Sequence, residues 1–240
     1  MHAIPGRQPV AEALRAGRQL HAVTVDRRAG ADLEALLSQA RQAGVTVRRG
    51  DRDDLDQLAG GVRHQGVVAT APPYPYRGLA ELGESDLLVV LDGVTDPQNL
   101  GAIARSAEAA GAGGLVLRER RSAGVTPAAE KAAAGALSWL PVVMVPNIVR
   151  ALADLTERGF WSVGLSGAGE MALWDCGLLD GKVAITIGGE GDGLSRLVAQ
   201  RVDQLVCIPM SGNIESLNAS AAAAVALFEV ARRKSSSRVR

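Results

Sequence analysis

Apolar runs alternate with helical segments from residue 86 to the end of the chain. The runs at 87–92 (LLVVLD) and 182–189 (KVAITIGG) are almost uninterrupted, as expected for strands that are buried on both faces. Such strands, when helices separate them, form mostly parallel sheets covered by helices on both sides. We therefore predict an α/β domain over residues 86–240.

A smaller unit with a similar alternation precedes this domain. Three short apolar runs are predicted strands, at residues 22–26, 45–49 and 65–71. Residues 31–44 (ADLEALLSQARQAG) have the apolar spacing of an amphipathic helix that ends at Gly44. The first part of the chain is therefore expected to be a small α/β domain.

Prolines and tyrosines separate the two units. The stretch PPYPYRGLAELGES begins at Pro72 and ends at Ser85, and it fits neither a strand nor a helix. This composition is typical of a linker. We predict three segments: a domain at 1–72, a linker at 73–85 and a domain at 86–240.

The charge balance and the cysteines limit the possible functions. The 240 residues contain 26 Lys and Arg and 26 Asp and Glu, so any nucleic-acid site must be a local patch. Cys176 and Cys207 belong to no CxxC or Cys/His cluster, which argues against zinc, disulfides and thiol chemistry. With no signal-peptide pattern and no apolar stretch of about 18 residues, we expect a cytoplasmic protein.

Three loops are candidates for the functional site, because parallel sheets bind ligands at the carboxyl ends of their strands. They span residues 93–100, 188–194 and 209–216. The second loop is rich in glycine but lacks the Gly-Lys-Ser/Thr ending of a Walker loop. Its carboxylate, Glu190, would repel phosphate and suits a hydroxyl or amino donor. The alternative is a plain strand-to-helix turn with an exposed glutamate.

Polar residues in and after the first and third loops have both a structural and a functional interpretation. Asn99 lies at a predicted helix cap. Arg105, about one and a half turns further along, is either a solvated charge or poised to meet a phosphate. Ser216 and Asn218 can both cap the last helix, but one cap is enough. We expect the surplus polar groups to contact a ligand.

The segment GAGEMA at 167–172 fits the G-x-G-x-x-G/A fingerprint of dinucleotide-binding proteins. That fingerprint needs a full crossover helix after its third small residue. Only about ten residues, interrupted by Gly177, separate it from the next predicted strand. An NAD-linked reductase is therefore disfavoured, and nicotinamide binding would be its test.

Three longer segments, in this order, closely resemble the signature motifs of the SpoU (TrmH-like) branch of the SPOUT RNA 2'-O-ribose methyltransferases. They are LDGVTDPQNLGAIARSAEAAG at 91–111, IGGEGDGLS at 187–195 and IPMSGNIESLNASAAAAVALFE at 208–229. In the first unit, GRQPVAEAL and HQGVVA resemble an N-terminal RNA-binding domain of ribosomal protein L30/L7Ae type. That domain is found in bacterial 23S rRNA guanosine 2'-O-methyltransferases.

The resemblance implies a fold, a cofactor and partners. The C-terminal domain is expected to be a SPOUT α/β fold with a deep trefoil knot, an exception to the rule that chains avoid knots. S-adenosylmethionine is the implied methyl donor, and no metal is implied. The implied partners are structured RNA, above all 23S rRNA, and a second copy of the chain in a homodimer with the site at the subunit interface. Neither a membrane nor DNA is expected as a partner.

Site residues follow from the resemblance by motif position. Contacts to the methyl donor are expected from Gly188, Gly189, Gly191, Ile208, Met210 and Leu217. Catalytic roles are expected for Asn99, Arg105, Glu190, Ser216 and Asn218. RNA contacts are expected from Arg7, Arg63, His64 and again Arg105. For Arg105 we favour electrostatic stabilisation of the developing oxyanion over proton abstraction, because a guanidinium keeps its proton near neutral pH.

Other substrates and one other class of function stay open at this point. The same chemistry on a tRNA, or on an rRNA site that confers antibiotic resistance, would leave the same motifs. A non-catalytic RNA-binding or ribosome-assembly protein could also keep the fold. The complete set of motif residues argues against the latter.

Overall fold

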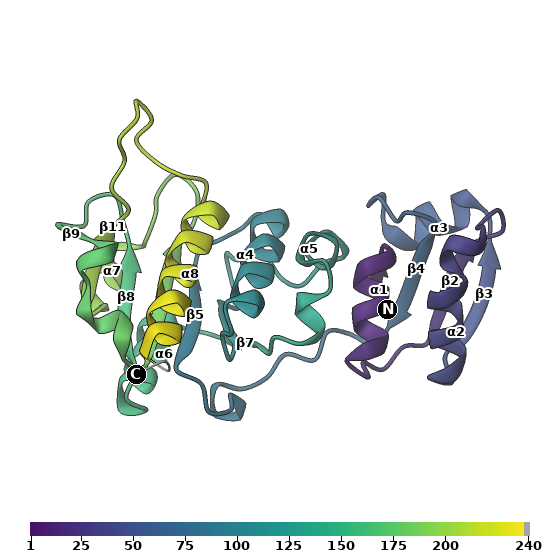
Figure 1. Cartoon of the computed structure of the whole chain (residues 1–240), viewed down its shortest axis with the longest axis horizontal. Helices are drawn as coiled ribbons and strands as arrows, with labels where there is room; N and C mark the ends of the chain where they lie inside the picture. The colour runs from purple at the N-terminus through teal and green to yellow at the C-terminus, as the bar shows by residue number, and fades with distance from the viewer. Residues whose placement is uncertain (238–240) are drawn as a thin grey trace.

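Two separate sheets organise the chain, one on each side of the proline-rich connection (Figure 1). The computed structural model describes the backbone of residues 1–237 and side chains as far as residue 235. Among these residues, no helix combines the length and the apolar character needed to cross a bilayer.

The N-terminal sheet has the strand order β1-β4-β2-β3. Its strands are β1 (His2–Pro5), β2 (Ala22–Asp26), β3 (Thr46–Gly50) and β4 (Val67–Ala71). Its helices are α1 (Arg7–Arg15), α2 (Glu34–Gln42) and α3 (Arg52–Ala59). Helices α1 and α2 pack on one face of the sheet and α3 packs on the other. The three predicted strands and the predicted helix are present, but β1, α1 and α3 have no counterpart among the predicted elements.

The C-terminal sheet has seven strands in the order β7-β6-β5-β10-β8-β11-β9, and every pair is parallel. The strands are β5 (Leu87–Asp92), β6 (Leu115–Arg118), β7 (Val142–Val145), β8 (Trp161–Leu165), β9 (Met171–Ala172), β10 (Val183–Gly188) and β11 (Gln204–Cys207). The helices are α4 (Pro97–Ala109), α5 (Pro127–Ala133), α6 (Ile148–Glu157), α7 (Arg196–Arg201) and α8 (Ala219–Ser237). The prediction of a mostly parallel sheet is confirmed.

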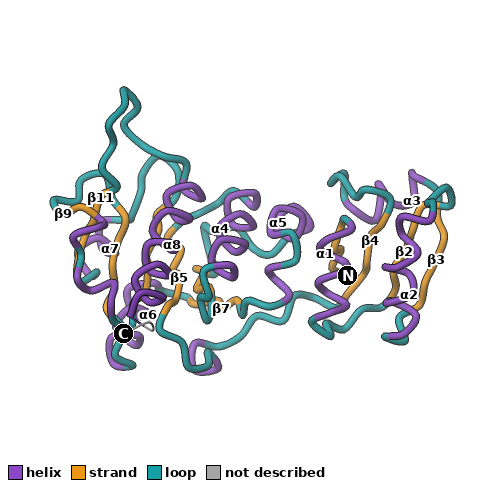
Figure 2. Tube along the Cα trace, in the orientation of Figure 1, coloured by secondary structure: helices purple, strands orange, loops and turns teal. Residues whose placement is uncertain are grey.

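The apolar strand runs bury both faces of this sheet. In β5, Leu87, Val89 and Leu91 belong to the core formed with α4, α5 and α8. Leu88 and Val90 point the other way, into the core formed with α6 and α7. Because successive side chains of a strand alternate between faces, a strand buried on both sides needs an unbroken apolar run. Figure 2 shows helices in front of and behind the strands.

Helix capping corrects one prediction. Thr126 and Asn147 cap α5 and α6, and each side chain accepts a hydrogen bond from a backbone N–H three residues later. At α4, however, the cap is Asp96, whose side chain accepts from the N–H of Gln98 at 2.8 Å. The prediction that Asn99 caps this helix is wrong, because the helix begins two residues before it. The side chain of Asn99 is therefore available for another partner.

A buried ion pair joins helix α5 to the N-terminal domain. Glu130 of α5 is fully buried, and its Oε1 accepts a hydrogen bond from Nη1 of Arg18 at 2.6 Å. The same oxygen lies 2.8 Å from Nε2 of His2. The guanidinium of Arg18 lies 5.0 Å from the ring centroid of Tyr74, whose hydroxyl donates to the carbonyl of Leu137. Residues from both domains and from the linker thus share one polar cluster.

Candidate active site

The three candidate loops meet at one edge of the C-terminal sheet. Strands β5 and β10 are parallel neighbours, and Gly188 pairs in register with Asp92, so the loops that follow them begin side by side. The third loop follows β11 and leads into α8, which packs against α4. Between β11 and α8 the chain projects away from the body of the domain (Figures 1 and 2).

Glycines allow the first two loops to touch through their backbones. The N–H of Gly189 donates to the carbonyl of Asp92 at 3.0 Å, and the N–H of Gly193 donates to the carbonyl of Gly189 at 3.2 Å. A Cβ at Gly188 would lie only 2.0 Å from the carbonyl carbon of Gly193. The buried carboxylate of Asp92 accepts from the N–H of Ser195 at 2.8 Å and so holds the far end of the loop.

One carboxylate links all three loops. Asn99, which is only 5% exposed, donates a short hydrogen bond from its side-chain amide to Oε1 of Glu190. Asn218 donates to the same oxygen at 3.2 Å. Asn218 also caps α8, since its Oδ1 accepts from the N–H of Ser220 at 2.9 Å. The two amides hold Glu190 at the entrance of α4 and α8, which is more than either helix cap requires.

A pocket of about 580 Å³ lies beside this cluster. It is lined by every residue predicted to contact the methyl donor: Gly188, Gly189, Gly191, Ile208, Met210 and Leu217. The predicted residues Glu190, Ser216 and Asn218 also line it. Its volume lies within the range of about 300–1,000 Å³ that is usual for small-molecule sites.

One further segment lines the pocket but was not among the three predicted loops. It consists of Leu165, Ser166 and Gly167, at and after the end of β8. The rule that selected the other loops, the carboxyl end of a parallel strand, applies equally to β8. In place of a crossover helix, the short strand β9 follows Gly167, so the segment does not form a dinucleotide site of Rossmann type.

The lining of the pocket indicates the charge of its ligand. The charged side chains that line it are Glu190, Asp192 and Glu215. No Lys or Arg of the described part of the chain is among its lining residues. The other walls are glycine backbone and apolar side chains. Such a site favours a neutral or cationic ligand and disfavours a polyphosphate. The described residues also contain no group of three or more His, Cys, Asp or Glu side chains arranged to hold a metal ion.

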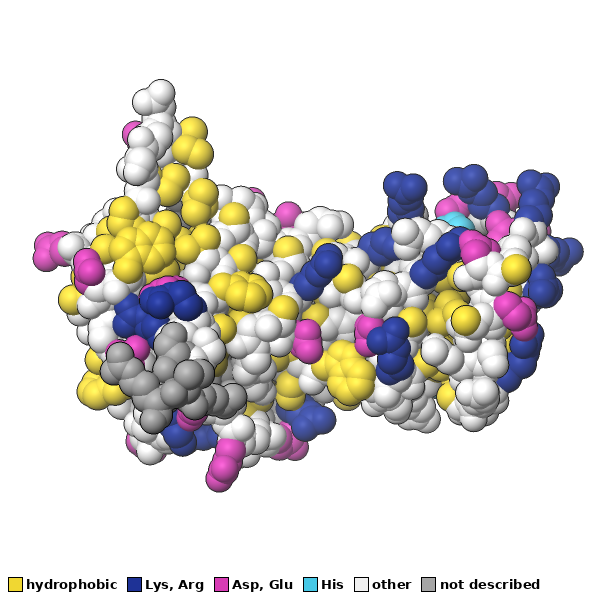
Figure 3. All heavy atoms as spheres, in the orientation of Figure 1, with side chains coloured by type: hydrophobic (Ala, Val, Ile, Leu, Met, Phe, Trp, Pro, Cys, Tyr) yellow, Lys and Arg dark blue, Asp and Glu magenta, His cyan; other side chains and the backbone are white. Residues whose placement is uncertain are grey.

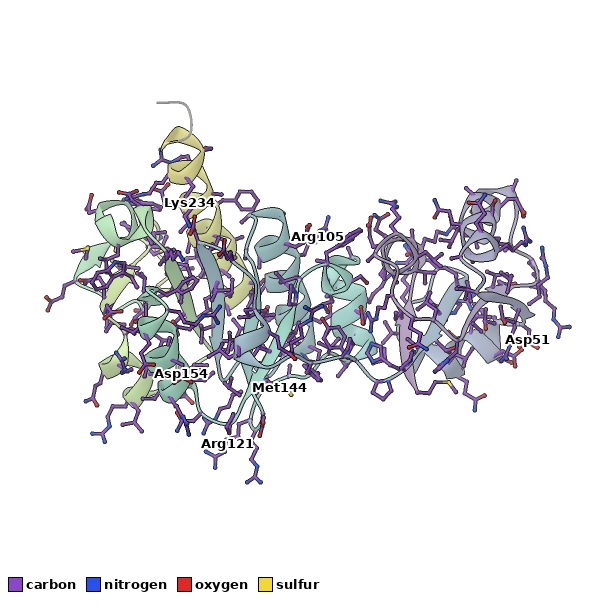
Figure 4. The ribbon with its side chains drawn as sticks, turned by 90° about the horizontal axis from the view of Figure 1, so that it is seen from below. Asp51, Arg105, Arg121, Met144, Asp154 and Lys234 are labelled. Atoms are coloured by element: carbon purple, nitrogen blue, oxygen red, sulfur yellow. The ribbon has the colours of Figure 1, made fainter. Side chains whose placement is uncertain are left out.

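Arg105 lies outside the pocket. It projects from the surface of α4 on the side of the sheet that carries α8 (Figure 4). Its side chain is exposed and makes no hydrogen bond or ion pair with the part of the chain that the structure describes. The guanidinium is therefore available to an external anion.

The predicted RNA contacts in the N-terminal domain differ in accessibility. Arg7 and Arg63 are exposed. His64 is only 6% exposed, and its ring lies 3.1 Å from a carboxylate oxygen of Asp56. Its other ring nitrogen accepts from the N–H of Gly66 at 3.1 Å. Both ring nitrogens of His64 are thus occupied within the protein.

Comparison with known families identifies the chain. Residues 86–228 match the family model described as the SpoU rRNA methylase family, and residues 3–77 match the one described as RNA 2'-O ribose methyltransferase substrate binding. This chain belongs to the SpoU family. Membership confirms the predicted reaction class, the transfer of a methyl group from S-adenosylmethionine to an RNA ribose.

Relatives of this SpoU protein match over most of its length. A protein of Xanthomonas campestris named 23S rRNA (guanosine-2'-O-)-methyltransferase RlmB is 45% identical over 209 residues, which cover 84% of each chain. A protein of Mycobacterium avium named an uncharacterised tRNA/rRNA methyltransferase is 43% identical over 239 residues, covering 95% of this chain and 76% of the relative. Both relationships extend over the two domains.

A solved structure has the same overall fold. The SpoU methyltransferase AviRb from Streptomyces viridochromogenes, in complex with the cofactor AdoMet, aligns with a TM-score of 0.81 and 28% identity. The alignment covers 98% of this chain and 90% of that chain. The SpoU fold assignment therefore rests on structure as well as on sequence.

Proposed function

We propose that this protein methylates the ribose 2'-hydroxyl of a guanosine in 23S rRNA, in the cytoplasm and as a homodimer. The observation that carries the proposal is the meeting of all three motif loops at one pocket and one carboxylate, Glu190. The named activity of the Xanthomonas relative supports 23S rRNA guanosine as the target. Residues 1–72 act as the RNA-binding domain, 73–85 as the linker and 86–240 as the methyltransferase domain.

The pocket fits S-adenosylmethionine. The ligand, when bound, supplies a methyl group activated by a sulfonium. The acidic lining suits its positive charges, while the apolar side chains Ile208, Met210 and Leu217 suit its adenine. Gly188, Gly189 and Gly191 leave backbone groups accessible to it.

The polar cluster positions the reacting groups. Glu190, fixed by the amides of Asn99 and Asn218, holds the three loops together and keeps a negative charge at the rim of the pocket. Ser216 is exposed in the third loop, where its hydroxyl can meet the ribose. Holding two reactants in a productive geometry is worth several kcal/mol, about 7–11 in favourable cases, so positioning supplies a large part of the rate.

Arg105 contacts the RNA beside the reacting ribose. Its exposed guanidinium pairs with a phosphate and stabilises the negative charge that develops on the 2'-oxygen. It does not act as the base, because a guanidinium does not give up its proton near neutral pH.

A knotted, dimeric fold is part of the proposal. Strand β10 lies between β5 and β8, both of which precede it in the chain, and α8 then returns to pack on α4, an arrangement compatible with threading of the last segments through a loop. Exposed Phe228 on α8, together with Arg105 on the neighbouring helix α4, supports a second subunit that completes the site.

The N-terminal domain, of L30/L7Ae type, binds the RNA through Arg7 and Arg63. The family match over residues 3–77 supports this role. For His64 we propose an indirect role, because its ring holds Gly66 and is buried. The ring of His64 fixes the conformation of the loop that contains Arg63 and Gln65.

Methyl transfer from labelled S-adenosylmethionine to unmodified 23S rRNA and to unmodified tRNA, followed by mapping of the product, tests the function. We expect one 2'-O-methylguanosine in 23S rRNA. A product in tRNA, or at another nucleotide, would replace the proposed substrate. Failure to bind S-adenosylmethionine in a calorimetric titration would instead indicate a non-catalytic RNA-binding protein.

Two variants of Arg105 test its role. Single-turnover methylation and RNA affinity should both fall for Arg105→Ala, whereas Arg105→Lys should retain part of the affinity because it keeps the charge. Full activity of Arg105→Ala would contradict the proposed role.

A further inference from the structure

Two cations, one from each domain, contact one glutamine at the domain junction, and a third lies near them. Nζ of Lys131, on α5 of the methyltransferase domain, donates to Oε1 of Gln65 at 2.6 Å. Nε of Arg7 donates to the backbone carbonyl of the same residue at 3.2 Å. Burial lowers the pKa of Lys131, and the nearby positive charge of Arg63 lowers this pKa further. We call these four residues the junction cluster.

The junction cluster carries an excess of positive charge. Arg7 is paired with Asp32 at 2.7 Å, but among the described residues no carboxylate lies within ion-pair distance of Arg63 or Lys131. In Figure 3, Lys and Arg side chains gather over the N-terminal domain and reach its junction with the methyltransferase domain. Like charges held together without counter-charges attract an external anion.

The backbone at the cluster is also adapted to close approach. Gln65 has a φ of 56°, in the left-handed region that non-glycine residues seldom adopt. Strained residues of this kind persist at functional sites. A Cβ at Gly6 would lie 2.4 Å from Nζ of Lys131, so a side chain there would displace the ammonium from its present position. The side-chain amide nitrogen of Gln65 has no hydrogen-bond partner among the described residues and can donate to a nucleotide.

The position of Lys131 is fixed by its neighbour. Glu130 precedes it on α5 and points into the buried ion pair with Arg18, while Lys131 points to the surface. The same helix turn therefore anchors the N-terminal domain and displays a cation beside it. The helix before it, α4, carries Arg105 and packs closely on α5.

We propose that the junction cluster is a composite RNA-binding site, in which Lys131 of the methyltransferase domain and Arg7, Arg63 and Gln65 of the N-terminal domain bind consecutive phosphates of the substrate RNA. The inference rests on the proposed function. The bound strand runs from the N-terminal domain over α5 toward Arg105. Lys131 thereby sets the distance between the recognised part of the RNA and the methylated ribose.

Binding of in vitro transcribed 23S rRNA at a series of salt concentrations tests this inference. Each phosphate contact contributes about 0.7–0.9 to the magnitude of the slope of log affinity against log salt concentration. The loss of one contact therefore lowers the affinity about sixfold at 0.1 M salt. We expect Lys131→Gln and Arg63→Gln each to lose about that affinity and that slope. The matched control is Arg150→Gln, an exposed arginine on α6 at the other face of the sheet, which should behave as the wild type.

Methylation kinetics give a second measurement. Lys131→Gln should raise KM for 23S rRNA about sixfold and leave kcat and the affinity for S-adenosylmethionine unchanged. Wild-type affinity and slope in Lys131→Gln, beside a loss in Arg63→Gln, would confine RNA binding to the N-terminal domain and overturn the inference. If the wild-type protein transferred no methyl group to rRNA, the proposed function itself would fall, so the two failures are distinguishable.

Discussion

Replacing Gly188 with alanine tests whether the pocket depends on close backbone packing within its second loop. Gly188 is the last residue of β10, and a Cβ built on it would lie 2.0 Å from the carbonyl carbon of Gly193 and 2.2 Å from its oxygen. Carbon atoms in ordinary contact are about 3.5 Å apart, so the loop would have to move by about 1.5 Å. Both clashing atoms are backbone, and no side-chain rotation can relieve them.

The consequence for activity follows from what this loop holds. A shift of that size would break the 3.2 Å hydrogen bond from Gly193 to Gly189 and displace Glu190 from its two amide partners. A misplacement of about 1 Å at a catalytic site lowers turnover by about 100-fold. We therefore expect Gly188→Ala to lose about 100-fold in kcat/KM and about tenfold or more in affinity for S-adenosylmethionine.

Isothermal titration with S-adenosylmethionine and methyl transfer to 23S rRNA provide the assays. Gly212 lies in the third loop with no atom within 4 Å of an added Cβ, so Gly212→Ala should match the wild type. Gly191 also has free space but a φ of 84°, so Gly191→Ala adds only strain, about 1–2 kcal/mol. If Gly188→Ala bound the methyl donor as tightly as Gly212→Ala, the steric reasoning would be refuted.

Three further predictions concern stability. Glu130→Ala leaves the guanidinium of Arg18 buried without a counter-charge. Urea denaturation should show a loss of about 3–5 kcal/mol in the free energy of unfolding. A loss below about 1 kcal/mol would mean that the pair is effectively solvated. Burial, and then Glu130, raise the pKa of Tyr74, so the folded state disfavours the phenolate and stability should fall as pH rises above about 10. Denaturation at pH 8 and 11 should show a smaller fall in Tyr74→Phe, and equal falls would contradict the assignment. Hydrogen bonds from Arg232 and Arg233 lower the pKa of Glu229 from 4.5 to about 2, against an opposing effect of burial. Stability from this group is present above pH 4.5 and lost as pH falls toward 2, and thermal unfolding of Glu229→Gln should lack that part of the pH dependence.

Local sequence patterns were sufficient to predict the part of the fold that carries the site. The runs that became β5 and β10 are apolar on both faces, and only a sheet covered by helices on both sides buries such strands. Parallel strands place their carboxyl ends at one edge, which brought the three predicted loops together without any knowledge of strand order. The same reasoning would have included Ser166, at the end of β8.

Contacts between distant segments could not be predicted in this way. Asparagine is a common helix-capping residue, but the side-chain amide of Asn99 donates its hydrogen bond to Glu190, 91 residues further along the chain. The junction cluster joins Gln65, in a segment that the sequence had singled out, to Lys131, which does not stand out in its own segment. The strand β1 is only four residues long, and its pairing with β4 depends on the tertiary fold. Periodicity reports which face of an element is buried, and it does not report the partner.

The strand order also bears on how the chain folds during synthesis. Strand β10 lies between β5 and β8, yet it emerges from the ribosome after both of them. Until residue 188 has been made, the facing edges of β5 and β8 expose unpaired backbone groups, which is the feature that promotes aggregation of unfinished sheets. Pairing over such separations is also slow. A nascent chain that stops before residue 183 therefore holds a sheet of β5, β6 and β7 with the edge of β5 unpaired, and β8 has no strand partner until β10 and β11 are made.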